Sequence, residues 1–522
     1  MSPGPVLSAL LLTLSLPPHP LPLLAPVALA PLAFHLERLP TTPAGTRSAA
    51  LAGIVVGGLH AVLLLHWLPG AAGPLMGPVR GVAGALAVWG LNAALVGVAL
   101  VLVHRGIIRG RLALPVGLAA AWTTLGWVPA TLPVVGFPWL GPEAALVGRP
   151  ELLGAADLVG GAGVAGLLAF SGGALGQWLA RRRKAERVGG RTRRWLGLAG
   201  VLLAVAAVYG HGRAAQLAPA GGDEIRVAAL SLDADPHLLV DREARERRLT
   251  AGLHRLSREL RPREADLIVW PESPTGAWDR PMEPFLAGYW SRRSGAPVLF
   301  GAVMALPGQG RSNRILMASG ARRGGLERAG DLRVVREKRR LVPVVERAYA
   351  RGLRRGGLDG PVEGPFVLPT PGDAELQAGA LICFEALFAR EALHLRRRGA
   401  RILAFPANEG WLNGPGAGIL DSARRQHRAA LVLRVVETRT GAVRSAVGGP
   451  AGTWSPVGRA LPGQVRAVEG AGYLFLGEVS PGPQRASLAA RGGAATTGLV
   501  AVLLLVGGAV VPGRNRGPRS RV

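Results

Sequence analysis

The segment Gly379–Phe388, "GALICFEALF", contains Cys383, the only cysteine among 522 residues. A short apolar run leads into the cysteine, which is typical of a buried strand that ends at a loop. A single cysteine cannot form a disulfide within the chain, and most buried cysteines are inert small hydrophobes. The remaining sequence therefore has to decide whether Cys383 is structural or a nucleophile.

The composition favours a membrane protein over a nucleic-acid-binding protein. Hydrophobic residues make up 49% of the chain and charged residues only 18%, which points to membrane segments rather than disorder. The formal net charge is +28, but we find no nucleic-acid recognition motif or aromatic-basic face. The basic residues cluster beside apolar runs, so membrane topology explains them better than a nucleic-acid partner.

The chain divides into three predicted blocks. Residues 1–212 form an N-terminal membrane domain of about seven helices, residues 213–486 a catalytic domain, and residues 487–522 a C-terminal transmembrane helix with a basic tail. Most of the apolar runs approach the ~20 residues that span a bilayer. The eight predicted helices are Val6–Leu16, Leu21–Leu36, Ser48–Leu68, Val79–Val103, Leu112–Leu132, Ala156–Leu179, Trp195–Tyr209 and Gly492–Val511.

The first helices have an alternative interpretation as a cleaved signal peptide, because Ala28–Ala30 resembles a cleavage site. Such a peptide begins with a positively charged region. No lysine or arginine precedes Arg38, so the sequence favours membrane helices here.

Positive charges predict the orientation in the membrane. With the N-terminus in the cytoplasm, the inside loops hold Arg38 and Arg47, then "HRGIIRGR", then eight Lys or Arg between Arg181 and Arg194, and then the basic C-terminal tail. The outside loops have few positive charges, with Arg80 and Arg149 as exceptions. This distribution follows the positive-inside rule. It predicts a multi-pass membrane protein whose 213–486 domain faces outside the cytoplasm.

Residues 213–486 alternate short β-like runs with helical stretches. Runs such as "IRVAALSL", "DLIVWPE", "APVLFGAVM" and "RILAFPAN" are separated by turns, and helices are predicted at Arg242–Leu260 and Glu391–Arg398. This alternation predicts an α/β domain.

Three chemically capable residues follow one another along this domain. Glu272 ends the strand "LIVWPES", Lys338 stands in "VVREKRRLVP", and Cys383 ends "GALICFE". Lysine is rare here, because the chain has only Lys184 besides Lys338, against 59 arginines. A thiol needs a base to form thiolate, and acyl transfer needs positive charge beside the developing oxyanion. Each signal alone is weak, but together they favour catalysis over a structural cysteine.

The motifs carry a family resemblance. The 213–486 domain resembles the nitrilase (carbon–nitrogen hydrolase) superfamily with its Glu-Lys-Cys triad, which implies an α-β-β-α sandwich. With membrane helices on both sides, the whole chain resembles the apolipoprotein N-acyltransferase family. The most specific pieces are "VWPES", "KRRLVPVVE", "ICFE" and "PANEGWLN", and "RVVETRTGAVRSAVGG" adds to them.

The resemblance implies roles for seven residues. Cys383 would be the nucleophile, Glu272 the base and Lys338 the electrostatic stabiliser. Four further positions match supporting residues of the family's active site, namely Glu346, Glu385, Asn313 and Trp411. Trp411 lies in Pro406–Gly418, whose glycine and tryptophan content is typical of a mobile lid.

The resemblance also implies a reaction and its partners. A membrane phospholipid would donate an acyl chain to the cysteine as a thioester, and the amine of an S-diacylglyceryl-cysteine apolipoprotein would accept it. The bilayer would be the third partner, with no cofactor, no metal and a monomeric enzyme. The ten histidines show no metal-ligand spacing.

Three departures from the family pattern leave the substrate contacts open: the stretch "SLDADPHLLVD" at Ser231–Asp241, Val447–Gly448, and Phe384 in place of the usual tyrosine.

Two alternatives to the acyltransferase function remain. One is a membrane-tethered nitrilase-type amidase, in which water replaces the lipoprotein amine. The other is a degenerate membrane scaffold, which an intact triad disfavours. The number of predicted helices favours the acyltransferase, because a soluble amide substrate gives no reason for them.

Overall fold

A computed structural model of the chain describes residues 2–19, 21–131, 137–139, 141–183, 189–217, 224–234, 241–275, 281–306, 310–319, 331–342, 346, 364–369, 375–412 and 417–510. Four features of the sequence analysis lie wholly or partly outside these residues. They are Lys184, the basic tail after Val510, most of the Ser231–Asp241 departure and the centre of the predicted lid loop.

The chain forms two compact units. The first, which we call the apolar unit, comprises Met1–His66, Leu86–Tyr209 and Gly492–Val522. The second, which we call the sheet unit, comprises Trp67–Ala85 and Gly210–Arg491. A short piece of the N-terminal region, Trp67–Ala85, therefore folds with the sheet although it lies between apolar helices in the sequence.

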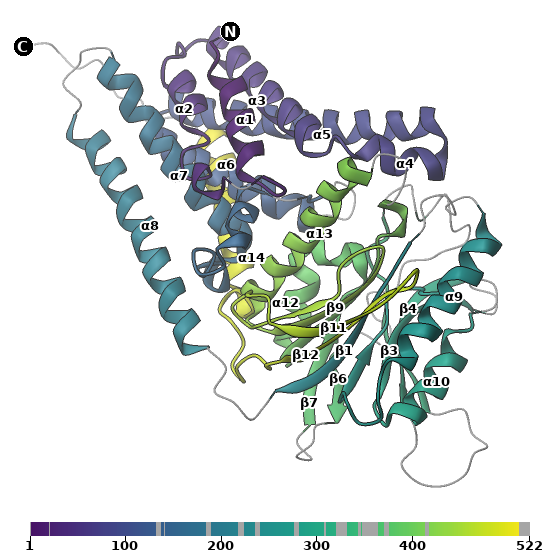
Figure 1. Cartoon of the computed structure of the whole chain (residues 1–522). Helices are drawn as coiled ribbons and strands as arrows, with labels where there is room; N and C mark the ends of the chain where they lie inside the picture. The colour runs from purple at the N-terminus through teal and green to yellow at the C-terminus, as the bar shows by residue number, and fades with distance from the viewer. Residues whose placement is uncertain are drawn as a thin grey trace, which may run out of the picture. The chain divides into compact units, whose positions relative to one another are not determined.

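The apolar runs of the sequence form helices (Figure 1). Prolines shorten the second predicted helix, so that Leu21–Leu36 contains only the 3₁₀ turn η1 and the short helix α2. The helices of this region are α1 (Gly4–Ser15), η1 (Pro22–Leu24), α2 (Ala30–Glu37), α3 (Pro43–Leu64), α4 (Leu68–Met76), α5 (Pro78–Ile108), α6 (Leu114–Thr131), η2 (Pro142–Gly148), α7 (Ala156–Arg183) and α8 (Gly190–Gln216), joined near the C-terminus by η6 (Ala489–Gly493) and α14 (Ala494–Val510).

Five helical segments of the described chain are long and apolar enough to cross a membrane. They are Pro43–Leu64, Pro78–Ile108, Ala156–Arg183, Gly190–Gln216 and Ala489–Val510. Their surfaces carry exposed apolar side chains such as Val208 and Leu503, which water would disfavour and lipid would accept. The predicted helical membrane region is confirmed, whereas the predicted number of eight spans is not.

Glycine permits close helix packing within the apolar unit. A Cβ atom on Gly176 of α7 would lie 2.2 Å from the carbonyl oxygen of Ala30, so α7 and α2 approach more closely than larger residues allow. Gly160 of the same helix has φ +74°, and α7 is kinked there.

The sheet unit is built on one mixed sheet. Its strands among the described residues lie in the order β5-β4-β3-β2-β1-β9-β8-β7-β6, with β10 on β9 and the β11–β12 pair on β1. The strands are β1 (Ile225–Leu232), β2 (Leu267–Val269), β3 (Val298–Leu306), β4 (Gly310–Ser319), β5 (Asp331–Glu337), β6 (Phe366–Pro369), β7 (Glu375–Ala380), β8 (Ile402–Asn408), β9 (Gly441–Val447), β10 (Gly452–Trp454), β11 (Gly463–Val468) and β12 (Gly472–Val479).

The strand directions bring several carboxyl ends to one edge. Strands β3, β2 and β1 are parallel, as are β9, β8 and β7, and the two groups join where Ser231 pairs with Ala446. Strand β4 is antiparallel to both β3 and β5, so β5 runs in the direction of β3. The segments that follow β2, β5, β7 and β8 therefore start from the same edge, where α/β sheets usually hold their sites.

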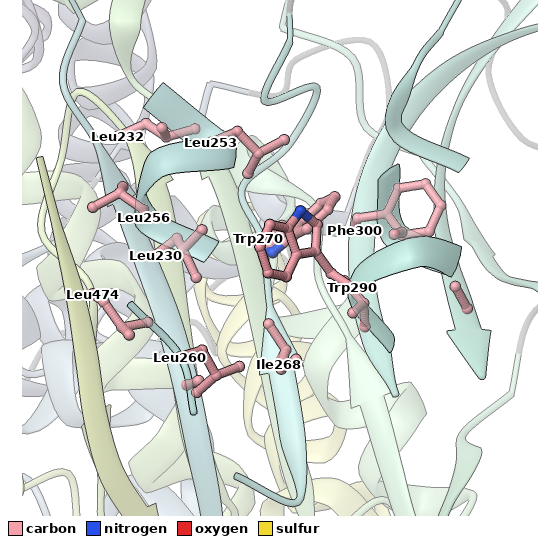
Figure 2. Close-up of a cluster of buried hydrophobic side chains, with 14 of the residues drawn as sticks. Leu230, Leu232, Leu253, Leu256, Leu260, Ile268, Trp270, Trp290, Phe300 and Leu474 are labelled. Carbon is pink, nitrogen blue, oxygen red and sulfur yellow. The ribbon is translucent and has the colours of Figure 1, made fainter. Parts of the chain in front are cut away.

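Helices cover the sheet. They are α9 (Arg242–Arg258), α10 (Glu283–Ser294), η4 (Cys383–Leu387), α12 (Ala389–Arg397), η5 (Gly410–Leu412) and α13 (Ala417–Thr438). Helices α9 and α10 pack on β1 and β3, and their apolar side chains meet alternate residues of the strands (Figure 2). In Figure 2, Leu253 and Trp290 from the helices lie with Leu230, Ile268 and Phe300 from the strands. The predicted α/β domain is confirmed.

Candidate active site

Lys338 stands directly after β5 and joins two carboxylates. Its ammonium Nζ donates to Glu272 Oε1 at 2.9 Å and to Glu346 Oε1 at 2.6 Å. Asn313 of β4 donates its side-chain amide to the same Glu272 oxygen at 2.6 Å, and its carbonyl accepts the Lys338 backbone N–H at 2.8 Å. Four of the seven predicted site residues are thus in direct contact, although they are up to 74 positions apart (346 minus 272).

The Lys338 side chain is fully buried but remains charged. Burial alone would lower its pKa, but the carboxylates of Glu272 and Glu346 raise the pKa well above 10.5. Burial acts in the opposite sense on Glu346 and raises the pKa of that carboxyl group, despite the nearby ammonium. Within the described part of the chain Nζ donates to two carboxylates, so one of its three N–H bonds is available to a substrate oxygen.

Cys383 begins η4, immediately beyond the apolar run that follows β7. Its φ of +49° is unusual for a residue with a side chain, and such strain typically costs about 1–3 kcal/mol and clusters at functional sites. The thiol Sγ lies 3.8 Å from the carbonyl oxygen of Asn408, whose amide donates to the Glu272 carbonyl at 3.2 Å. Asn408 at the end of β8 therefore connects the cysteine turn to the Glu272 segment.

The Cys383 thiol is mainly protonated in the free protein. Burial and the negative charge of Glu272 raise its pKa well above 9, while Lys338 opposes them with a smaller effect. Formation of the reactive thiolate then requires a base beside it, and the Glu272 carboxylate is the charged group with the largest effect on this thiol. The arrangement suits a nucleophile that is activated on demand rather than a permanently ionised thiolate.

Glu385 occupies a different position from the other predicted carboxylates. Both of its oxygens accept from Arg336, at 2.8 and 3.0 Å, and they also accept the backbone N–H groups of Arg339 and Ile382 at 2.9 Å each. The side chain is fully buried. Glu385 therefore ties the segment after β5 to the residue that precedes the nucleophile, and it acts on Cys383 through the backbone.

Trp411 lies in η5, and its ring meets Trp67 edge to face at 6.5 Å between centroids. Trp67 is buried and donates its indole N–H to Gln426 of α13 at 3.0 Å. The sequence analysis placed Trp67 within a membrane helix and missed this contact. Of the predicted lid Pro406–Gly418, the described ends belong to β8, η5 and α13.

Four further polar residues lie close to the cysteine and were not predicted individually. Asn408 and Glu409 follow the buried run of β8, and both were visible as the polar end of "PANE". His427 and Arg444 are buried on α13 and β9, where nothing in the local sequence distinguishes them from other basic residues. Among the described residues no group of three or more His, Cys, Asp or Glu is placed to hold a metal ion.

Comparison with known proteins finds relatives of one kind. A family model described as the apolipoprotein N-acyltransferase N-terminal domain matches residues 8–174. Apolipoprotein N-acyltransferase 2 of Treponema pallidum (strain Nichols) is 24% identical over 397 residues, which are 65% of this chain and 66% of that protein. The chain is therefore similar to apolipoprotein N-acyltransferases. The apolipoprotein N-acyltransferase of Chlorobaculum tepidum, another relative, is 28% identical over 252 residues, 43% of this chain and 45% of that one.

The chain spans just under two thirds of the length of the Treponema pallidum relative and about half of the length of the Chlorobaculum tepidum relative. Solved structures match the chain over about half its length. An amidase from Nesterenkonia sp. is 17% identical, with a TM-score of 0.34, and covers 50% of this chain and 92% of its own. A carbon–nitrogen hydrolase from Helicobacter pylori G27 is 12% identical, with a TM-score of 0.35, and covers 49% of this chain and 89% of its own.

Proposed function

We propose that the protein transfers an acyl chain from a membrane phospholipid to the N-terminal amine of S-diacylglyceryl-cysteine apolipoproteins through a thioester at Cys383. The observation that carries the proposal is the buried Glu272–Lys338–Glu346 cluster at the sheet edge that also holds Cys383. The similarity to apolipoprotein N-acyltransferases supports the same activity. In this proposal Glu272, Lys338 and Cys383 are catalytic, and Glu346, Glu385, Asn313 and Trp411 support them.

In the first half-reaction Glu272 removes the thiol proton, and the Cys383 sulfur attacks the ester carbonyl of the phospholipid. The carbonyl oxygen becomes an oxyanion, and the remaining N–H of Lys338 stabilises it. The intermediate collapses by breaking the ester C–O bond, and protonated Glu272 returns its proton to the departing lysophospholipid oxygen. The product is an acyl thioester on Cys383 and a lysophospholipid.

In the second half-reaction the free amine of the lipoprotein attacks the thioester carbonyl. Glu272 accepts the amine proton, Lys338 again faces the oxyanion, and the C–S bond breaks to release an amide and restore the cysteine. The two lipid substrates need not occupy the site together, because the thioester preserves the activated acyl group between them. Exclusion of water from the buried cluster protects that thioester from hydrolysis.

The cellular location and membrane orientation of the protein follow from the same proposal. The apolar unit anchors the protein in the bacterial inner membrane as a multi-pass protein, and the domain of residues 213–486 faces outside the cytoplasm, where lipoproteins mature. Arginine-rich stretches such as Arg181–Arg194 support a cytoplasmic position for the loops that hold them. We propose a monomer, since the catalytic glutamate, lysine and cysteine and the supporting Glu346 come from one chain.

Mass spectrometry of the purified protein tests the proposal. After incubation with phospholipid, an acyl group should appear on the Cys383 peptide and disappear on addition of a diacylated lipopeptide amine. The lipopeptide should gain the same acyl mass. An acyl-enzyme that transfers only to water would favour the amidase, and absence of any adduct would refute the mechanism.

A further inference from the structure

A second buried cluster lies behind the peptide of the nucleophile. His427 of α13 is almost fully buried and places its ring Nε2 at 3.0 Å from the Cys383 carbonyl oxygen. Its other ring nitrogen, Nδ1, lies 2.5 Å from Glu409 Oε1. Arg444 of β9, also fully buried, donates to the same Glu409 oxygen at 2.5 Å. The cluster thus connects three elements of the sheet unit to the turn that holds the thiol.

The hydrogen-bond partners define where the protons of His427 lie. A peptide carbonyl can only accept, so Nε2 must donate to Cys383. Burial opposes ionisation of Glu409, but Arg444 and His427 lower the pKa of its carboxyl to about 2, so this group also only accepts. With Nε2 donating to Cys383, Nδ1 of the same ring faces the Glu409 carboxylate.

The other charges near this cluster come from α13 and β9. Arg424, three residues before His427, and Arg428, the residue after it, interact electrostatically with Glu409 and with Asp421. Arg428 also faces Arg444. Glu409 is the buried member of these two carboxylates, so its loss would leave the buried positive charge less compensated.

The turn at Cys383 is held at both ends. Glu385 accepts the N–H of Ile382 on one side of the nucleophile, and His427 donates to the carbonyl of Cys383 on the other. Rotation of that carbonyl would change the left-handed backbone of Cys383 and with it the direction of the thiol.

We propose that His427, held by Glu409, which Arg444 braces in turn, is a positioning residue that clamps the Cys383 carbonyl and fixes the thiol in its reactive direction. The inference deepens the proposed function, because it names how that site holds its nucleophile. It needs no acyl donor for its test, however, since the thiol can be studied directly.

Alkylation of the full-length protein in detergent provides the test, because Cys383 is the only cysteine and every adduct reports on it. The rate with iodoacetamide is measured from pH 6 to 10 for the wild type, His427→Gln and Glu409→Gln. His254→Gln is the matched control, since His254 lies on α9 and packs on Trp290. Thermal unfolding of each variant reports whether it folds.

We expect His427→Gln to slow iodoacetamide alkylation of Cys383 by about tenfold at every pH of the series, because a small misplacement of a reacting group lowers its rate by such factors. Glu409→Gln should slow alkylation in the same sense, because a neutral amide holds the His427 ring less firmly than a carboxylate does. The control should match the wild type.

A wild-type profile in a folded His427→Gln or Glu409→Gln variant would overturn the proposal. If His427→Gln does not fold, Glu409→Gln decides alone, and failure of both to fold would assign the cluster to stability instead and also overturn it. Slower alkylation of the two variants, in a protein whose wild type forms no acyl-enzyme, would support the clamp and refute the acyl-transfer function. Failure of the clamp and failure of the proposed function therefore give different results.

Discussion

Two of the buried ion clusters near the cysteine turn, the lysine cluster and the arginine cluster, are built on different cations. In the lysine cluster, a single ammonium donates to Glu272 and Glu346 and, among the described residues, has one further N–H. In the arginine cluster, Arg336 forms a two-point pair with Glu385 and a further bond to Glu391, which also accepts from Arg340. A planar guanidinium can bind a carboxylate at two points, whereas a compact ammonium acts as a point charge.

This difference gives the two clusters different roles, catalysis for the lysine cluster and support of the turn for the arginine cluster. The arginine cluster holds the turn through bonds to buried carboxylates and to the backbone before Cys383, so its loss should cost stability. The lysine cluster lies beside the thiol, and its ammonium donates to two carboxylates among the residues that the structure describes, so its loss should cost rate. Glu385, which the sequence analysis grouped with the active-site carboxylates, belongs by its contacts to the supporting cluster.

Removal of the nucleophile should have the largest effect on activity. Cys383→Ala is expected to abolish acyl-enzyme formation while both ion clusters and the unfolding temperature remain close to those of the wild type. The measurement is mass spectrometry of the protein after incubation with phospholipid, alongside thermal unfolding. Cys383→Ser serves as the companion variant and should form at most a slow oxygen ester, because its hydroxyl ionises far less readily. Turnover by the alanine variant would refute the mechanism.

Lys338→Arg should come next and tests the comparison directly. A guanidinium keeps the charge but is larger and directs its donors differently, so the oxyanion loses its partner. We expect a loss of about 10²–10³ in acyl-transfer rate, the usual effect of removing one such donor. The rate is measured together with membrane expression.

Lys184→Arg is the matched control for that experiment, because it changes the chain's other lysine in the same way. It should leave the rate unchanged. Equal wild-type rates for both variants would mean that Lys338 is one more basic residue, and the lysine cluster would lose its catalytic assignment.

Arg336→Ala should show the opposite pattern. Loss of one partner from a buried ion pair leaves the carboxylates of Glu385 and Glu391 uncompensated, at a cost of about 3–5 kcal/mol in the free energy of unfolding. Denaturant unfolding in detergent measures it. The control is Arg226→Ala, whose pair with Asp266 is half exposed and should contribute less than about 1 kcal/mol. Full stability with lost activity would place Arg336 in the chemistry.

The smallest expected effect is on the thiol itself. Glu272 raises the pKa of Cys383, so Glu272→Gln should lower that pKa and speed iodoacetamide alkylation at pH 8 by a few-fold to about tenfold, even as acyl transfer is lost. Glu385→Gln should leave the alkylation rate of the folded protein unchanged, because its carboxylate is already neutralised by Arg336. Similar effects from both substitutions would remove the distinction between the clusters.

Local patterns in the sequence determined the elements and the candidate chemistry. Apolar runs long enough for a bilayer predicted the helical region, and strands alternating with helices predicted the sheet. The rarity of Cys383 and Lys338 marked them without any knowledge of their neighbours. These properties are local, because helix length, strand period and residue type are encoded in a few consecutive positions.

Tertiary structure alone decided which charges meet. The parallel strands bring the segments after β2, β5 and β7 to one edge, so Glu272 and Lys338 bond across 66 positions. The same pairing decides that Glu385 contacts an arginine rather than the catalytic lysine, and it buries His427 against Cys383. The spacing of residues in the sequence does not predict the order of the strands. It also does not show which of the 61 basic residues are buried against a carboxylate, because that depends on the tertiary packing.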